Sequence, residues 1–423
     1  MTQTRSHIFR RPGPATAATT GTAPPAAPPA VEPASELHVN LQRLRANLAQ
    51  FRRVVGRRVR LCAVIKKDAY GLGATSVGPC LADAGCDMLA VYDEQEASQL
   101  LGAGLAEREV ELLVMGPVWD VAPGPVADAA GAGRLHLSIH EPGQVHALAA
   151  AAARLDARLP VHVFLDTGMS RSGLEPGHLP SVVTRIRHER HLRLAGIYSH
   201  LATAEQPDDF AERQLKRFQA ALADAGRLRR ITRHLANTCA TLRSDAFHLD
   251  MVRVGLGLLG YGPDRLAGPR CVDADFALKP TVRWTSRLIQ LRWYPPGAAI
   301  GYGQTHRMDR PSLLGLVPVG YGDGYPVALG NRATVAVRLD GRWRDAPVRG
   351  RVNMDQITVD LTDAAAHLPT QEPATLDALR GGAVELVSDD PAAPHALPRL
   401  AALADTHCYD LLCRMRGRRV HTW

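Results

Sequence analysis

Eight short apolar segments, spaced about one helix apart, constrain the fold of this chain more than any other feature. They are residues 60–66, 88–92, 110–115, 135–139, 161–165, 192–199, 231–235 and 252–256. Stretches rich in alanine and leucine separate them, and strands buried on both faces and joined by helices form parallel sheets. Eight such units predict a closed, TIM-like (β/α)8 barrel, whose functional groups gather at the carboxyl ends of the strands.

The sequence changes in character after about residue 275, where long helical stretches become rare. Candidate strands lie at 281–292, 313–319, 333–340, 346–353 and 355–361, separated by turns that contain glycine and proline. We therefore expect the barrel over residues 36–275 and a second, mainly β domain over residues 276–423. A length of 423 residues suits two domains.

The first 35 residues differ from the rest in composition. Residues 11–35 consist mostly of Pro, Ala and Thr, which cannot offset the entropy of ordering by burial, so a disordered tail is expected. Arg10 and Arg11 are compatible with a twin-arginine export signal, but no apolar segment follows them and export is the weaker interpretation. Ordered structure should begin near Glu36, with Asn40 capping the first helix.

Charge and cysteine content argue against several classes of protein. The net charge is +8, but the basic residues are spread along the chain without a recognition motif, so no nucleic-acid partner is expected. No apolar run is long enough to span a bilayer, and no membrane partner is expected. Seven cysteines without a CxxC pair argue against disulfides or a metal site and favour a cytoplasmic location.

Lys66 is the first candidate catalytic residue, because it ends the first barrel strand. The chain has only four lysines, so few residues offer a primary amine. Burial at the mouth of a barrel lowers the pKa of a lysine and frees its amine to form a Schiff base. A surface lysine before a glycine turn is the simpler interpretation, and it suits Lys67.

The segment AVIKKDAYGLG, residues 63–73, resembles the cofactor-lysine signature of the alanine racemases. These are fold-type III enzymes that use pyridoxal 5′-phosphate (PLP) and combine a barrel with a C-terminal β domain. The resemblance continues in order from about residue 36 onward. It implies that Lys66 binds PLP covalently, that Tyr70 lies beside the PLP phosphate, and that a small amino acid is racemised. Conversion of L-alanine to D-alanine, a peptidoglycan precursor, is the expected reaction.

Later segments extend the resemblance. Arg171, in LDTGMSRSGL, would reach the 3-hydroxyl oxygen of PLP and the substrate carboxylate, to which a guanidinium fork is suited. A structural salt bridge with Asp166 is the simpler interpretation of Arg171. His200 would lie near the pyridine ring, and Arg253 would donate a hydrogen bond to the ring nitrogen. Arginine stays protonated, so it would disfavour protonation of that nitrogen and favour racemisation over transamination.

The phosphate group should bind after the seventh and eighth strands, as is common in this barrel. The resemblance implies that Asn237, Thr238 and the backbone N–H groups of Gly255 and Leu256 take part there, together with Tyr409 from the second domain.

The second domain would supply the other catalytic base. The resemblance implies that Tyr302 acts from the partner subunit of a homodimer with shared active sites, linked to Arg253 through His200. Racemisation moves protons on both faces of a planar carbanion, so one lysine is not enough. Tyr321 and Met354 would lie near the substrate.

Phe164 departs from the family pattern. Many members carry a carbamylated lysine at this position, whose charge positions the arginine, and phenylalanine cannot be carbamylated. Asp166, Gln356 or a bound anion are alternative supports for Arg171. We expect the site's affinity or specificity to differ in consequence.

Three other functions stay open. A racemase for another or broader range of amino acids, such as serine or basic amino acids, would use the same chemistry. A non-catalytic PLP-binding barrel protein would lack the β domain and Tyr302. A fold-type III decarboxylase would carry an acidic residue in place of Arg253.

Overall fold

The computed structural model describes residues 33–262, 272 and 275–423, so the predicted disordered tail lies outside the described residues except for positions 33–35. Eight parallel strands close into a barrel in chain order, and β9 pairs with β2 to complete it. They are β2 (Arg60–Val64), β3 (Met88–Val91), β4 (Glu111–Pro117), β5 (Leu135–Ile139), β6 (Leu159–Phe164), β7 (Leu192–Tyr198), β8 (Thr232–His234) and β9 (Met251–Val254). The predicted barrel is confirmed.

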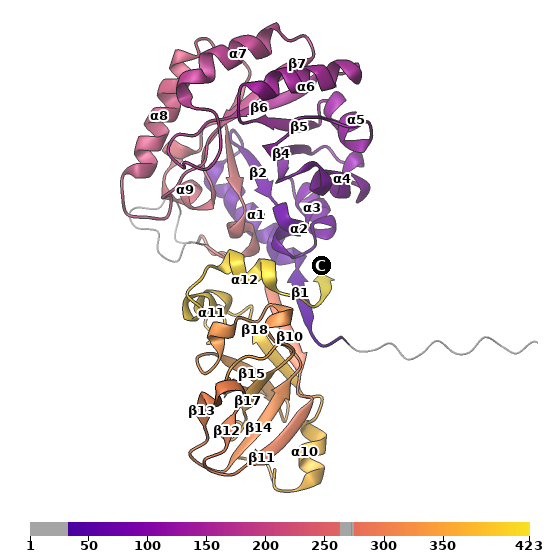
Figure 1. The fold of residues 1–423 in the computed structure, drawn as a ribbon, viewed down its shortest axis with the longest axis vertical. Coiled ribbons are helices and arrows are strands. Elements are labelled where there is room, and N and C mark those ends of the chain that lie inside the picture. Colours follow the sequence, from indigo (N-terminus) through magenta and orange to yellow (C-terminus); the bar gives the residue numbers. More distant parts are fainter. Residues whose placement is uncertain (1–32, 263–271, 273–274) are drawn as a thin grey trace, which may run out of the picture. The chain divides into compact units, whose positions relative to one another are not determined.

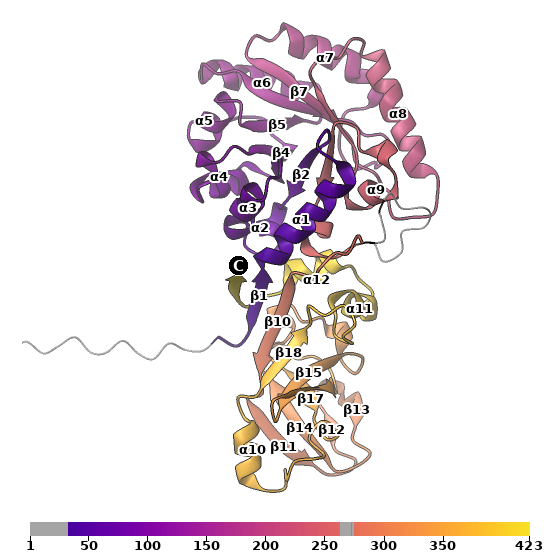
Figure 2. The same ribbon diagram turned by 180° about the vertical axis from the view of Figure 1, so that it is seen from behind.

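Helices surround this barrel (Figures 1 and 2). They are α1 (Leu41–Val55), α3 (Ala74–Asp83), α4 (Glu94–Gly102), α5 (Pro125–Gly131), α6 (Gly143–Arg154), α7 (Leu179–His188), α8 (Phe210–Asp224) and α9 (Thr238–Arg243). Asn40 caps α1 as predicted, since its side-chain oxygen accepts a hydrogen bond from the Arg43 backbone N–H at 2.9 Å. Strands β3 and β5 are buried along their whole length, as parallel barrel strands should be.

The rest of the chain is mainly β structure, as predicted. A six-stranded sheet has the order β16-β15-β18-β10-β1-β19, a three-stranded sheet has the order β11-β14-β17, and β12 pairs with β13. The strands are β1 (Glu36–Asn40), β10 (Val282–Arg287), β11 (Gln290–Tyr294), β12 (Ala299–Ile300), β13 (His306–Arg307), β14 (Ser312–Val317), β15 (Thr334–Leu339), β16 (Arg342–Pro347), β17 (Ile357–Asp360), β18 (Ala383–Val387) and β19 (Arg418–Thr422). The helices are α10 (Pro373–Leu379), α11 (Leu397–Leu403) and α12 (Cys408–Arg414).

Several details differ from the sequence prediction. The segment at Glu36 was expected to be the start of the barrel domain. It forms β1 instead, which lies between β10 and β19 in the six-stranded sheet. The single strand expected at 281–292 is two strands in different sheets. The strand expected at 346–353 begins earlier, because Asp340 and Gly341 take positive φ angles of 44° and 82° and close a β15–β16 hairpin. The domain boundary at residue 275 stays a prediction.

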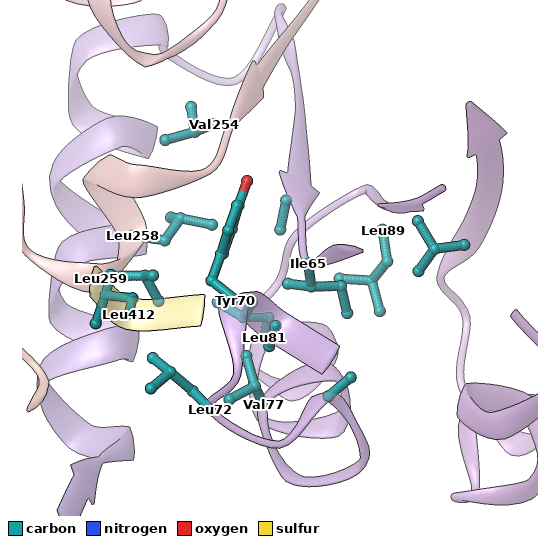
Figure 3. Close-up of a cluster of buried hydrophobic side chains, with 14 of the residues drawn as sticks. Ile65, Tyr70, Leu72, Val77, Leu81, Leu89, Val254, Leu258, Leu259 and Leu412 are labelled. Carbon is teal, nitrogen blue, oxygen red and sulfur yellow. The ribbon is translucent and has the colours of Figure 1, made fainter. Parts of the chain in front are cut away.

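An apolar cluster lies beneath the mouth of the barrel (Figure 3). Leu412 of α12 joins Leu258 and Leu259, which follow β9, and Leu72 and Val77. All five side chains are at most 2% exposed. Helix α12 is thereby fixed against the barrel segments that carry the candidate site. Among the described residues, no helix is long and apolar enough to cross a membrane.

Candidate active site

Lys66 lies at the carboxyl end of β2. Only one residue, the buried Ile65, separates it from the strand. The pKa of its amine is lowered, first by burial and then by the positive charge of Arg171. A lowered pKa leaves more of the amine unprotonated near neutral pH, which is the form that acts as a nucleophile or base. The position predicted for Lys66 therefore gives it the predicted electrostatic character.

The residues after Lys66 form a turn of left-handed helix. Four consecutive residues other than glycine, Lys67 to Tyr70, have φ angles between 52° and 58°. This conformation costs an L-residue roughly 1–2 kcal/mol. The Asp68 carboxylate offsets part of the strain, because it accepts a hydrogen bond from the Ala74 backbone at 2.7 Å and pairs with Arg419 at 2.6 Å. The turn directs the Tyr70 ring into the molecule, where it is 6% exposed.

Tyr70, Thr238 and Tyr409 gather around the backbone that follows β9. The rings of Tyr70 and Tyr409 lie 5.3 Å apart. The Thr238 hydroxyl accepts a hydrogen bond from the Gly255 backbone N–H at 3.3 Å. A Cβ atom added to Gly255 would lie 2.4 Å from the Tyr70 oxygen, so only glycine allows this approach.

This cradle brings hydroxyl and backbone N–H groups together at the place where the sequence predicts a phosphate site. Asn237 has a structural role beside it. Its side-chain oxygen accepts a hydrogen bond from the Ala240 backbone at 3.0 Å and so caps α9. The predicted contact of Asn237 with a cofactor stays a prediction.

Arg253 is a buried cation held by several acceptors. Its guanidinium donates to the Ser199 carbonyl oxygen at 2.8 Å, to Nδ1 of His234 at 3.0 Å and to Nδ1 of His200 at 3.4 Å. It also lies over the Tyr198 ring, 5.2 Å from the centroid. Because a guanidinium only donates, both histidines accept at Nδ1 and carry their proton on Nε2.

His200 stays neutral in this environment. Burial, together with the positive charges of Arg253 and Arg171, lowers its pKa to about 3. Its Nε2–H is therefore available to a group in the site.

Asp166 does not form the salt bridge with Arg171 that was the simpler interpretation of the sequence. Its Oδ1 atom accepts the backbone N–H groups of Gly168, Met169 and Ser170 at 2.8, 2.8 and 3.1 Å, which shapes the loop after β6. In the described part of the chain no ion pair joins Asp166 to Arg171, whose side chain is exposed.

Phe164 lies in a cluster of aromatic rings. Its ring lies 4.6 Å from that of Tyr198 and 5.1 Å from that of His140. His140 in turn hydrogen-bonds to Ser172, next to Arg171, at 2.6 Å. The segment carrying Arg171 is thus anchored by a neutral hydrogen bond in a largely aromatic environment.

Three predicted residues of the second domain are not brought to this group. Tyr302 is 72% exposed, Met354 is 55% exposed and Tyr321 is 45% exposed. Across residues 275–423 as described, no side-chain hydrogen bond or ring contact connects these three to Lys66 or Arg253. One chain therefore presents the predicted site without these three residues.

Sequence reasoning missed three buried histidines that belong to the surroundings of Arg253. His136, His162 and His234 lie on β5, β6 and β8 and are at most 4% exposed. The available signal was one histidine within each of three otherwise largely apolar strand segments.

A closed parallel barrel with a half-buried lysine at its mouth, a cradle of hydroxyl and N–H groups, and a following β domain defines a class of two-domain barrel proteins with a reactive lysine. The family models described as "Alanine racemase, N-terminal domain" and "Alanine racemase, C-terminal domain" match residues 39–263 and 281–423. The chain belongs to the alanine racemase family.

Individual relatives agree with this assignment. The alanine racemase of Acidithiobacillus ferrooxidans is 35% identical over 377 residues, covering 89% of this chain and 94% of the relative. The structure of alanine racemase from Streptomyces coelicolor A3(2) matches with a TM-score of 0.78 and 30% identity, over 92% of this chain and 98% of that one. A crystal structure of alanine racemase from Bartonella henselae with covalently bound pyridoxal phosphate has a TM-score of 0.74 and 26% identity, over 92% and 99% of the two chains.

Proposed function

We propose that this protein is a PLP-dependent racemase that interconverts L-alanine and D-alanine. The observation that carries the proposal is that one barrel contains both Lys66, whose pKa is lowered at the barrel mouth, and Arg253, a buried arginine of β9. Bound PLP supplies an electron sink that makes the hydrogen on the α-carbon of an amino acid acidic.

The residues present suit this cofactor. Lys66 would hold PLP covalently, and the cradle of Tyr70, Thr238, Gly255 and Tyr409 would hold the phosphate. The fit rests on the Gly255 backbone, which lies so close to the Tyr70 hydroxyl that no side chain fits between them. Leu256 would add its backbone N–H, and Asn237 would line the pocket.

Two groups would move protons, one on each face of the substrate. Once the amine of the substrate has replaced Lys66 on the cofactor, the freed and unprotonated amine of Lys66 would accept the α-proton on one face. Tyr302 of the partner subunit serves the other face, aided by His200, whose free Nε2–H can bond to the phenol oxygen. The exposure of Tyr302 in the single chain supports a homodimer in which each subunit completes the site of the other. Tyr321 and Met354 would then line the substrate channel.

Arg171 and Arg253 would orient the bound molecules. The Arg171 guanidinium would bind the substrate carboxylate and the 3-hydroxyl oxygen of the cofactor. Arg253 would donate to the ring nitrogen, and as a permanent cation it would disfavour a second positive charge there. This would favour return of the proton to the α-carbon, and therefore racemisation over transamination.

The first test replaces Lys66 by alanine and uses Lys67→Ala as the matched control. Lys67 is the adjacent lysine, with a side chain that is 59% exposed. We expect Lys66→Ala to lose the visible absorption band of lysine-bound PLP and racemisation in both directions, while Lys67→Ala keeps both. Persistence of the band in Lys66→Ala would refute the assignment.

A second candidate is a racemase with a broader range of amino acids. Phe164 supports it, because a phenylalanine cannot be carbamylated to position Arg171 and the specificity of the site is then expected to differ. Inversion assays with L- and D-enantiomers of alanine, serine, lysine and arginine distinguish the two. We expect alanine to give the highest kcat/KM, and equal values across the panel would favour the broader enzyme.

The dimer and the location are further parts of the proposal. Light scattering should give about twice the 45.6 kDa mass of one chain. A cytoplasmic location would suit the free, buried thiols of Cys62, Cys80 and Cys86.

A further inference from the structure

We propose that three histidines inside the barrel, His136, His162 and His234, form a one-directional chain of hydrogen bonds that positions Arg253. They are positioning residues, since none of them touches the reacting atoms. The role of Arg253 toward the cofactor rests on the proposed function. The chain of histidine hydrogen bonds does not depend on that function, because it is formed by the protein's own side chains.

The chain crosses the barrel from one end to the other. Nδ1 of His234 lies 3.0 Å from the Arg253 guanidinium, and Nε2 of His234 lies 2.9 Å from Nδ1 of His162. Nε2 of His162 lies 2.8 Å from Nδ1 of His136. Within the described residues Nε2 of His136 has no hydrogen-bond partner, and the Glu111 carboxylate lies 3.7 Å away. Arg60 holds that carboxylate at 2.6 Å.

The direction of every bond follows from Arg253. The guanidinium can only donate, so Nδ1 of His234 accepts and its proton is on Nε2. That Nε2–H donates to His162, which must then also carry its proton on Nε2 and donate to His136. The last Nε2–H points at the Glu111 carboxylate. One arginine at the site thus fixes the tautomer of three rings.

Gly196 of β7 leaves the space that the ring of His162 occupies. A Cβ atom at position 196 would lie 2.3 Å from Nδ1 of His162, so the ring occupies the space of the missing side chain and reaches His234 across β7. The Tyr198 ring stacks on His234 at 4.7 Å with an angle of 6° between the planes. The same Tyr198 stacks on Phe164, so one ring lies between Phe164 and His234.

Burying three polar imidazole rings in a barrel core costs free energy unless hydrogen bonds offset their desolvation. Barrel interiors are filled mainly by branched apolar side chains, and a buried polar group without a partner is costly. The pKa of His136 is lowered to about 4, mainly by burial and against the charge of Glu111. Burial also lowers the pKa values of His162 and His234 well below the usual 6.5, and the charge of Arg60 acts in the same direction on all three rings. Neutral rings are the form that the chain requires.

Breaking the chain in its middle should disturb Arg253. In His162→Leu, the Nε2–H of His234 loses its acceptor. The other tautomer of His234 has no proton on Nε2 and so needs no acceptor there. It would, however, place an Nδ1–H group opposite an N–H group of Arg253, and two donors repel. Both tautomers are penalised, so Arg253 loses a defined partner. In His162→Gln, the amide oxygen can accept from His234 and the amide N–H can donate to His136, so much of the effect should be rescued.

The first experiment records the tautomers by 15N NMR of the PLP-loaded protein labelled on histidine, at neutral pH and without substrate. Signals are assigned from the ring lost in each single histidine-to-glutamine variant. We expect an Nε2–H and an unprotonated Nδ1 for His136, His162 and His234. An imidazolium, or a proton on Nδ1 of any of the three, would overturn the proposal.

The second experiment measures the dissociation constant of PLP by equilibrium dialysis. Loss of a hydrogen bond to a charged group predicts an increase of about tenfold in His162→Leu and less than about threefold in His162→Gln. The control is His395→Leu, which removes an equally buried imidazole, 3.0 Å from Glu385, in the second domain. Equal increases in His162→Leu and His395→Leu would overturn the positioning role.

The two proposals can fail separately. If the tautomers are as expected but no amino acid is racemised, the histidine chain stands and the proposed function is wrong. If alanine is racemised and the tautomers differ, the chain is wrong and the function stands.

Discussion

Replacing Gly196 by alanine should destabilise the barrel more than an ordinary glycine-to-alanine change in a strand. The new Cβ would lie 2.3 Å from Nδ1 and 2.5 Å from Cε1 of His162, and 2.8 Å from the Thr232 carbonyl oxygen. Neither neighbour can yield easily, because His162 is hydrogen-bonded on both sides and Thr232 is backbone. Overpacking of this kind costs about 1–3 kcal/mol. Each kcal/mol lowers the Tm of a domain of this size by roughly 2–4 °C.

Thermal unfolding followed by circular dichroism, at fixed protein and PLP concentrations, measures the effect. Gly315→Ala in β14 is the matched control, because its Cβ would meet the methyl ends of side chains, namely Leu288 at 2.8 Å, Leu361 at 2.9 Å and Val359 at 3.4 Å. Gly102→Ala meets nothing within 4 Å and should leave the Tm unchanged or raise it. If Gly196→Ala costs no more than Gly315→Ala, the reasoning that His162 fills the space at Gly196 is refuted.

Three further predictions concern the site. Tyr302→Phe should impair proton exchange on one face, seen as unequal solvent-deuterium incorporation from L- and D-alanine, and equal losses from both enantiomers would contradict the two-base mechanism. Omitting bicarbonate should leave activity unchanged, because Phe164 cannot be carbamylated; a clear bicarbonate dependence would show that another group is. Lys67→Gly should raise stability by up to about 1 kcal/mol, because glycine relieves the strain at φ 52° at a smaller entropic cost. Lys216→Gly in α8 should lower stability by about 1 kcal/mol, and a loss of similar size in Lys67→Gly would contradict the strain argument.

The barrel could be predicted because its signal is local and repeated. Each strand is a short apolar run flanked by helix-forming residues, and eight runs in series leave few alternative folds. The second domain was predicted less accurately because its pairings are distant in sequence. Nothing near Glu36 indicates that its strand pairs with Thr285 on one side and Arg418 on the other. The Asp340–Gly341 hairpin was a local signal that the prediction overlooked.

The candidate site shows the same division. Lys66, Arg253 and Thr238 were assigned from short motifs, and the structure places them at the carboxyl ends of the strands or directly after them. The histidine chain was missed because its members are 26 and 72 positions apart and meet only when the barrel closes. A histidine on one strand reads as an isolated polar residue until its neighbours are known.

The pairing of β1 with β19 has a consequence for the order of synthesis. Glu36 and Arg418 are 382 positions apart, and β1 lies between β19 and β10 in the finished sheet. While the chain emerges from the ribosome, α1 and the barrel strands can assemble from residues already made. The strand that precedes them must wait for β10, and it receives its second neighbour only when the segment at Arg418 has been released. Strand β1, the first element of the described chain, is thus among the last to be enclosed, and during that interval its apolar residues, Leu37 and Val39, need protection from other chains.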